Sequence, residues 1–249
     1  MIGRLDIKFY GSDGKRKYNY NTGIKHIKDC TICVKANQSI INDKFYDNMI
    51  NNNKYYLPFI DGIYSFKEKK LYAYAELPNI HFTYKINRNF PKYDKNDEEE
   101  LMKRIINPIY PNNDDAFYNA HIKERALAGC YEDKKWYGYS GSRNSGKGTE
   151  TTLLKNAFGE FVKEFNAKCL IFNKFGNPDP AKALSWVVDK KDARIIISNE
   201  IDGDESTILN GAFIKSLASG GDAMEGRRLY ENIQSFIPQF TMFLCYNKF

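Results

Sequence analysis

GSRNSGKGTETTLL, residues 141–154, places three glycines and a lysine within nine positions, directly before a helix-like run. The chain has only 17 glycines among its 249 residues, so this clustering needs a reason. A short apolar run, KKWYGYSG at 134–141, precedes the cluster and is typical of a strand. Apolar residues then recur at helical spacing at Leu153, Leu154, Ala157, Phe158, Phe161, Val162 and Phe165. The order of strand, glycine loop and helix predicts a loop that binds phosphate.

The spacing Gly141-x4-Gly146-Lys147 is that of a Walker A motif. Glycines let successive backbone N–H groups point at an anion, and the following helix adds partial positive charge. The predicted phosphate-binding residues are Gly141, Asn144, Ser145, Gly146, Lys147, Gly148 and Thr149. Lys147 is expected to reach the β- and γ-phosphates of ATP. Gly148 stands where a magnesium-binding Ser or Thr is usual, so Thr149 takes that role in this prediction.

A phosphate loop also needs an acid on a neighbouring strand to hold Mg²⁺ and to orient water. The segment ARIIISNE, at 193–200, is a buried-strand candidate that ends in Asn199 and Glu200. The carboxyl ends of parallel strands are where ligands bind in open α/β sheets. Glu200 is therefore the predicted catalytic acid and the second magnesium ligand.

Strands and helices alternate through the second half of the chain. KCLIFN (168–173), ARIIISNE and QFTMFLCYN (239–247) are predicted buried strands. PAKALSWVV (180–188) and STILNGAFIKSLA (206–218) are predicted helices. This alternation predicts an α/β fold with a mainly parallel sheet.

The first half has a different pattern. A helical stripe covers 39–50, and the aromatic segment 55–77 is expected to form strands that reverse at Asp61-Gly62 and at 67–70. Helices are predicted at 97–106, ending near Pro108, and from an Asp114 cap to about Ala128. The predicted domains are an α+β unit at 1–112 and a phosphate-loop core at 113–249.

Composition limits the remaining possibilities. The net charge of +6 permits a polyanionic partner without requiring one. Five cysteines argue against a disulfide framework, and Cys30 and Cys33 form only half of a zinc site. No stretch approaches the roughly 20 apolar residues of a membrane span, and the N-terminus lacks a signal-peptide core. We therefore expect a soluble, cytoplasmic protein without a membrane partner.

Two further segments, IKSLASGGDAMEGRRLY (214–230) and FIPQFTMFLCYN (236–247), complete a recognisable order of motifs. With the glycine loop and the Glu200 strand, they resemble the superfamily-three helicases, especially the poxvirus-type primase-helicases of large DNA viruses and related phage and plasmid proteins. The resemblance covers about residues 130–249. Residues 55–110 are similar, more loosely, to the domain that precedes the helicase core in that family.

The resemblance implies a role for each motif. Glu200 would polarise the attacking water, and Asn247 would sense the γ-phosphate. The nucleic-acid-binding residues would be Lys215, Gly220, Gly221, Asp222 and Arg227, towards the channel of a hexameric ring. The implied cofactors are ATP and Mg²⁺, and the implied partner is single-stranded or forked DNA. If the protein is viral, its place is the host cytoplasm or a viral replication site.

The resemblance also implies parts beyond these residues. The chain stops at Phe249, two residues past Asn247, whereas the arginine finger of this family lies beyond that strand. The expected fold is therefore an incomplete AAA+-like phosphate-loop core, preceded by a smaller α+β domain. A downstream polypeptide or an upstream primase domain is expected as a partner, and the chain alone is expected to turn over ATP slowly.

Three alternatives stay open at this point. A nucleoside-phosphate kinase is one, because GKGT also occurs in adenylate-kinase-like loops; the position of the loop at residue 141 and the lack of an arginine-rich lid argue against it. A module that binds ATP or DNA without turnover is another. The third is a truncated chain with no activity of its own.

Overall fold

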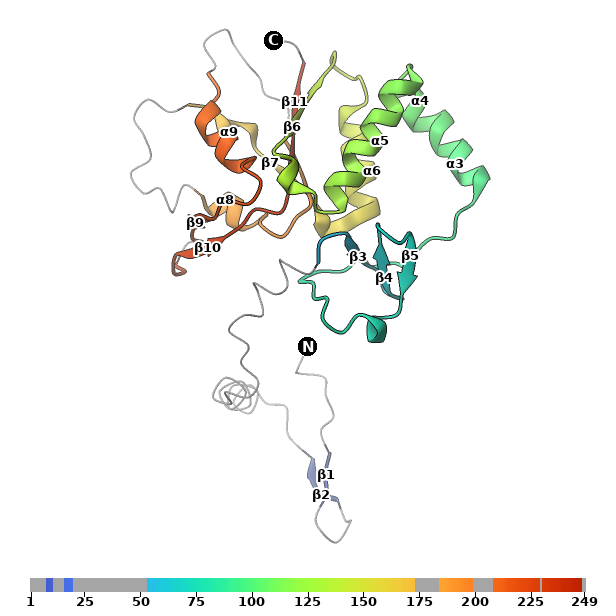
Figure 1. Ribbon diagram of the computed structural model, residues 1–249, viewed down its shortest axis with the longest axis vertical. Coiled ribbons are helices and arrows are strands. Elements are labelled where there is room, and N and C mark those ends of the chain that lie inside the picture. Colours follow the sequence, from blue (N-terminus) through green and yellow to red (C-terminus); the bar gives the residue numbers. More distant parts are fainter. Residues whose placement is uncertain are drawn as a thin grey trace. The chain divides into compact units, whose positions relative to one another are not determined.

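A computed structural model describes the backbone of residues 8–10 and 16–19, and in full residues 53–172, 184–198, 208–228 and 230–247 (Figure 1). The chain divides into two compact units, Met1–Asn48 and Met49–Phe249. In the first unit, strands β1 (Lys8–Tyr10) and β2 (Arg16–Asn19) pair antiparallel. The predicted helix at 39–50 and the Cys30/Cys33 pair lie outside the described residues. The rest of this section concerns the second unit.

A small antiparallel sheet opens the second unit. Its strands are β3 (Tyr56–Pro58), β4 (Ile63–Ser65) and β5 (Lys70–Tyr72), in that order. The N–H of Phe59 donates to the carbonyl of Gly62 at 2.7 Å, which closes the first reversal. The strands and reversals predicted for 55–77 are therefore confirmed. Leu57 of β3 and Phe59, directly after it, share a buried cluster with Ile86 and Phe161.

A helical arm follows, which we define as residues 95–109. It consists of α3 (Lys95–Leu101), a π-helical turn (Met102–Ile106) and α4 (Asn107–Ile109), and it is capped by the Asp94 carboxylate, which accepts from the N–H of Asn96 at 2.7 Å. The predicted helix at 97–106 is confirmed, and it ends one residue past Pro108.

Helix α5 (Asn113–Leu127) comes next. Its cap is Asn112, whose side chain accepts from the N–H of Asp114 at 3.0 Å, so the prediction of Asp114 as the cap was wrong. Asn112 has an extended backbone, as a cap requires, whereas Asp114 already lies in the first turn. The predicted end near Ala128 is confirmed.

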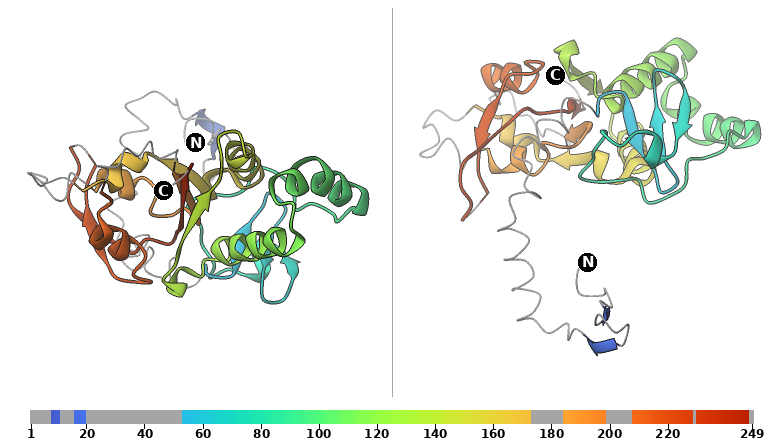
Figure 2. Two further views of the ribbon diagram at one scale, coloured as in Figure 1. Left: turned by 90° about the horizontal axis from the view of Figure 1, so that it is seen from above. Right: turned by 60° about the horizontal axis from the view of Figure 1, so that its bottom comes forward.

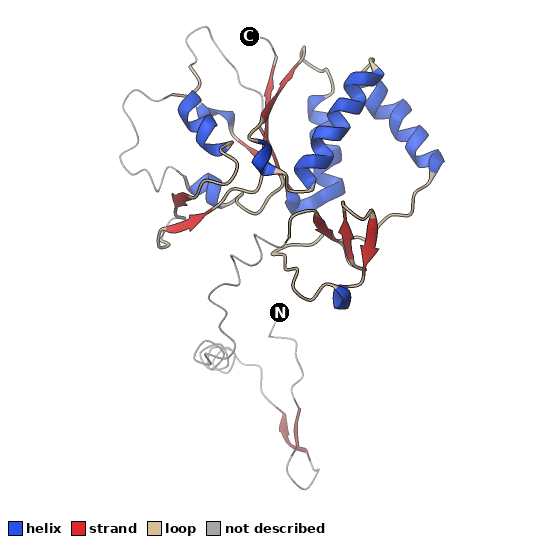
Figure 3. Ribbon diagram, in the orientation of Figure 1, coloured by secondary structure: helices blue, strands red, loops and turns tan. Residues whose placement is uncertain are grey.

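The main sheet has four strands in the order β6-β11-β8-β7, and every pairing is parallel. The strands are β6 (Trp136–Ser140), β7 (Val162–Phe165), β8 (Ile195–Ser198) and β11 (Thr241–Tyr246). Helix α6 (Lys147–Phe158) connects β6 to the rest of the sheet (Figure 3). The predicted α/β class, with a mainly parallel sheet, is confirmed for the described residues.

Helices cover both faces of this sheet. Ile195, Ile197 and Phe243 share a core with Ile122 of α5 and Leu154 of α6. Helices α8 (Ser185–Val188) and α9 (Gly211–Leu217) lie on the opposite side (Figures 1 and 2). On that side Trp186 stacks on Phe165, with ring centroids 5.1 Å apart, and meets Phe213 edge-on. Residues of β8 are buried on both faces, which explains their unbroken run of isoleucine.

Two predictions between α6 and α8 were wrong. The helix expected to run to Phe165 ends at Phe158, and β7 begins at Val162 after a short 3₁₀ turn. KCLIFN is not a buried strand, because Asn166 caps a 3₁₀ turn at Ala167–Leu170 by accepting from the N–H of Lys168 at 2.9 Å.

The structure describes only part of each of the two later predicted helices. Of 180–188, the structure describes 184–188, in which α8 begins at Ser185. Of 206–218, the described part forms helix only from Gly211, because the Asn210 side chain caps it and Leu209 forms an isolated bridge with Ile171. None of the described helices combines the length and the apolar character that a membrane span needs.

Candidate functional site

The glycine loop, residues 141–146, joins the carboxyl end of β6 to the first turn of α6. Two of its residues have a left-handed backbone: Asn144, with φ 63°, and Gly146, with φ 95°. The N–H of Gly141 donates to the Tyr246 carbonyl at 3.3 Å, and this bond ties the loop to β11. The chain therefore turns sharply and presents the N-terminus of α6 to the loop, an arrangement suited to anions.

Lys147 is the first residue of α6, and its side chain folds back over the loop. Its ammonium group donates to the carbonyl of Gly141 at 2.9 Å and to that of Ser142 at 3.2 Å. It also contacts the Ser145 hydroxyl at 3.3 Å and the Oδ1 of Asn247 at 3.2 Å. The loop thus holds the charge of Lys147 within a shell of oxygen atoms.

Asn247 reaches this point because it directly follows β11. Strand β11 pairs with β6 on one side and with β8 on the other, so the carboxyl ends of the three strands meet at one edge. At that edge the Ser198 hydroxyl of β8 accepts from the N–H of Cys245 at 2.8 Å. Asn199 and Glu200 lie outside the described residues.

The glycine loop lines two cavities. One has a volume of about 520 Å³ and is lined by residues 143–149. The other, of about 630 Å³, is lined by Gly141, Ser142, Ser145 and Lys147 together with Ile109, Tyr110, Asp115, Tyr118, Asn119, Ile122, Tyr137, Gly138, Tyr139 and Ser140. Gly148 and Thr149 lie in the first turn of α6, and a Cβ at Gly148 would meet no atom within 4 Å. Six of the seven predicted phosphate-binding residues line the first cavity, and Gly141 lines the second, which shares Ser145 and Lys147 with the first.

The described residues contain no group of three or more His, Cys, Asp or Glu side chains that could hold a metal ion. A phosphate-loop magnesium site differs from such a cluster, because it takes a hydroxyl, one acid and phosphate oxygens. Thr149, the predicted hydroxyl ligand, is exposed in the first turn of α6. Cys130 and Cys169 are free thiols.

The predicted nucleic-acid residues follow one another from α9 into β9 (Met224–Gly226). Lys215 is exposed on α9, and Arg227 directly follows β9. Gly220 has φ 78°, and a Cβ there would lie 2.6 Å from Cγ of Lys134. The absence of a side chain at Gly220 thus allows Lys134 to pack closely against it. Gly220 lies far from the glycine loop along the chain.

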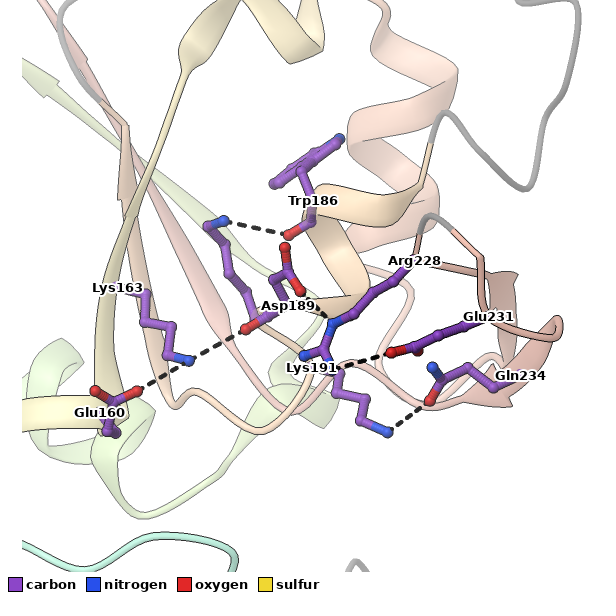
Figure 4. Close-up of polar contacts among 9 residues, drawn as sticks. Glu160, Lys163, Trp186, Asp189, Lys191, Arg228, Glu231 and Gln234 are labelled. Atoms are coloured by element: carbon purple, nitrogen blue, oxygen red, sulfur yellow. Dashed lines mark hydrogen bonds and ion pairs between the residues drawn. The ribbon is translucent and has the colours of Figure 1, made fainter.

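Sequence reasoning missed the hairpin in which β9 pairs antiparallel with β10 (Gln234–Phe236). At its tip Tyr230 is 98% exposed. Two contacts tie the hairpin to the end of α8: Arg228 Nε lies 2.5 Å from the Asp189 carboxylate, and Lys191 donates to Gln234 at 2.9 Å (Figure 4). Arg228 and Tyr230 are exposed, but no tight-turn motif marks the hairpin in the sequence.

Comparison with known proteins confirms the resemblance to helicases of viruses with large DNA genomes and their satellites. The chain is 32% identical over 192 residues to V13 of Sputnik virophage, which is named as a candidate helicase; the match covers 77% of this chain and 24% of V13. It is 24% identical over 216 residues to L207/L206 of Acanthamoeba polyphaga mimivirus, also named as a candidate helicase, covering 86% of this chain and 22% of that protein. The chain spans about a quarter of the length of these curated relatives.

Solved structures give a more distant match. Two structures of the NrS-1 C-terminal region align with TM-scores of 0.46 and 0.43, at 15% and 10% identity. They cover 59% and 82% of this chain, and 33% and 56% of the NrS-1 chains. No protein-family profile matches the sequence.

Proposed function

We propose that this chain is the nucleotide-binding part of a replicative DNA helicase of the superfamily-three type. The observation that carries the proposal is the convergence of Lys147 and Asn247 at the carboxyl edge of a parallel sheet, over a glycine loop. In this proposal the sheet and its helices are an AAA+-like phosphate-loop core. The viral relatives named as helicases support the same assignment.

ATP would bind with its phosphates in the glycine loop. Its phosphate oxygens would take the place of the carbonyl and hydroxyl oxygens that now surround the Lys147 ammonium. The loop N–H groups and the N-terminus of α6 would stabilise the same negative charge. Because the lysine is already held over the loop, little ordering is needed when the ligand binds.

Hydrolysis would depend on three side chains. Thr149 and Glu200 would hold Mg²⁺, which when bound neutralises charge on the phosphate oxygens. Glu200 would also orient the attacking water. The Asn247 amide would donate to the γ-phosphate as charge develops on it, a form of catalysis that depends on pre-positioned donors.

DNA binding would involve Lys215, Gly220, Gly221, Asp222, Arg227 and the tip of the β9–β10 hairpin. Exposed aromatic and basic side chains together suit single-stranded DNA, because bases stack on the ring while cations follow the backbone. Affinity is expected to fall with added salt as counterions are released. We further propose a hexameric ring, acting with the remaining parts of a longer protein, in the host cytoplasm or at a viral replication site.

The test is ATP turnover by the wild-type chain and Glu200→Gln, measured as phosphate release with and without single-stranded DNA. The proposal expects the variant to bind ATP normally and to lose hydrolysis. Measurable turnover that is equal in the two proteins would contradict the role of Glu200. Transfer of phosphate to a nucleoside monophosphate, in place of release to water, would favour a kinase.

A further inference from the structure

A buried polar network lies directly behind the glycine loop. Its centre is Glu150, one turn after Lys147, with only 3% of its surface exposed. The Glu150 carboxylate accepts from the hydroxyl of Tyr110 at 2.8 Å and from the amide of Asn119 at 2.7 Å. It also forms an ion pair with Lys123, which is 7% exposed. We call Tyr110, Asn119, Lys123, Tyr139 and Glu150 the Glu150 network.

The network contacts the chain on both sides of the loop. The Asn119 side chain accepts from the hydroxyl of Tyr139 at 2.7 Å. Tyr139 lies on β6, two residues before Gly141, whereas Glu150 lies three residues after Lys147. Asn119 and α5 therefore fix the spacing between the strand that enters the loop and the helix that leaves it.

The helical arm also ends on the loop. A Cβ at Gly146 would lie 2.5 Å from Cγ1 of Ile109, so Ile109 packs directly over this glycine. The next residue, Tyr110, donates to Glu150. Ile109, the last residue of the arm, and Tyr110, which follows it, thus contact the loop and the first turn of α6.

Burying these charged and polar side chains carries a free-energy penalty. Burial lowers the pKa of Lys123, although the Glu150 carboxylate opposes that shift. Burial and the Glu150 charge raise the pKa of the Tyr110 and Tyr139 hydroxyls, so both remain protonated donors. Buried ion pairs often give no more stability than apolar side chains of the same size. What directional hydrogen bonds add is a fixed geometry for the groups they join.

We propose that Tyr110, Asn119, Lys123 and Glu150 are positioning residues, which hold the glycine loop in its phosphate-binding shape and couple it to the helical arm. The inference rests on the proposed function of the loop. Without the network the loop would have to be ordered when the nucleotide binds, and that ordering would weaken affinity. Conversely, nucleotide binding would order the end of the arm through Ile109 and Tyr110.

The first test compares Tyr110→Phe with Tyr93→Phe. Both variants remove a hydroxyl that donates to a glutamate, since Tyr93 donates to Glu98 at 2.6 Å, but Tyr93 is 77% exposed and precedes the far end of the arm. Each protein is titrated with a fluorescent ATP analogue at a temperature where circular dichroism shows it folded. Tyr110→Phe is expected to bind about tenfold more weakly, as for the loss of a hydrogen bond to a charged group. Tyr93→Phe is expected to bind like the wild type.

The second measurement separates positioning from simple stability. Hydrogen exchange of the backbone amides of Ile106, Asn107, Ile109 and Tyr110 is followed with and without the nucleotide. The wild type and Tyr93→Phe are expected to gain protection on binding, and Tyr110→Phe to lose that gain. The inference would be overturned if Tyr110→Phe bound the nucleotide within twofold of the wild-type affinity, or if it gained the same protection on binding as the wild type. Either result would leave the proposed function standing. A wild-type chain that binds no nucleotide would overturn the proposed function together with the inference.

A further single variant and a double variant separate an effect on stability from an effect on nucleotide affinity. Glu150→Gln keeps the size of the side chain and one acceptor, but it leaves the charge of Lys123 unpaired. The double variant Glu150→Gln with Lys123→Met removes that charge as well. If the network positions the loop, the double variant regains stability while its nucleotide affinity stays reduced. Recovery of both to wild-type values would show a role in stability only and would overturn the inference.

Discussion

The ammonium group of Lys147 lies 3.2 Å from the Oδ1 of Asn247, although the two residues are 100 positions apart in the chain. The contact exists because β6 and β11 are parallel neighbours, so the residues that follow them emerge at the same edge of the sheet. In the proposed mechanism, Lys147 binds the phosphates and Asn247 stabilises charge that develops during hydrolysis. The two side chains should therefore affect different steps.

Asn247→Ala is expected to bind ATP within a few-fold of the wild type and to hydrolyse it about 100-fold more slowly, the usual cost of losing one pre-positioned donor. Titration with an ATP analogue and steady-state phosphate release measure the two effects. Asn166→Ala is the control, because Asn166 caps a 3₁₀ turn outside the glycine loop. An equal loss of binding and turnover in Asn247→Ala would contradict a role specific to hydrolysis.

Gly146→Ala and Gly148→Ala should change stability in opposite directions. Alanine at Gly146 would need φ 95° and would crowd Ile109, so we expect a loss of at least about 1 kcal/mol. Alanine at Gly148 meets no atom and improves helix propensity, so we expect a gain of about 0.5–1 kcal/mol. Urea denaturation of both variants checks this. A Gly146→Ala protein as stable as the wild type would show that the loop adopts another conformation.

The sequence predicted the strands of the site because their patterns are unambiguous. The isoleucines of β8 and the apolar run of β11 are continuous, short and bounded by polar residues, as buried parallel strands should be. The glycine spacing then predicted a loop directly after β6. The contact between Lys147 and Asn247 also requires β6 and β11 to be neighbours in the sheet, and the sequence pattern did not predict that strand order.

Other features could not be predicted because two local structures compete for the same residues, and a single sequence does not show which of them forms. VKEF (162–165) is short enough to continue the apolar stripe of α6, so its strand pairing with β8 was missed. Asn112 and Asp114 are both good caps, and only the backbone conformation decides between them. The members of the Glu150 network come from four separate segments and share no spacing, so no periodic pattern could have identified them.

Tyr230→Ala should weaken binding to single-stranded DNA by about 1–3 kcal/mol, the usual contribution of one base stacked on an aromatic ring. Tyr93→Ala is the matched control, because Tyr93 is also exposed but lies before the helical arm rather than on the hairpin. Fluorescence anisotropy with labelled oligonucleotides, over a range of salt concentrations, measures both. Equal affinities of the two variants would exclude the hairpin tip from the DNA-binding surface.

The ion pair between Arg125 and Asp133 predicts a specific pH dependence. Two hydrogen bonds of 2.7 Å from the Arg125 guanidinium lower the pKa of the Asp133 carboxyl below its ordinary value of 3.8. A lowered carboxyl pKa stabilises the fold above 3.8, and the contribution is lost as pH falls through the lower folded-state value. Since the pair is partly exposed, Asp133→Asn should cost only about 0.5–1 kcal/mol at pH 7.

Urea denaturation of wild type and Asp133→Asn, from pH 7 to strongly acidic pH, checks this dependence. The difference between them should disappear at the acidic end. Glu99→Gln is the control, because its pair with Lys95 is long and well exposed and should contribute little at any pH. A difference that persists unchanged in acid would mean that Asp133 acts through packing rather than charge.

The most direct test of the central claim is the affinity of the chain for a fluorescent ATP analogue with Mg²⁺, compared between Lys147→Ala and Lys155→Ala. Both lysines lie on α6, but Lys155 is in its last turn and pairs with Glu164. We predict that Lys147→Ala abolishes binding while circular dichroism shows an intact fold, and that Lys155→Ala binds like the wild type. Unchanged binding by a folded Lys147→Ala protein would contradict the assignment of the glycine loop as the nucleotide site.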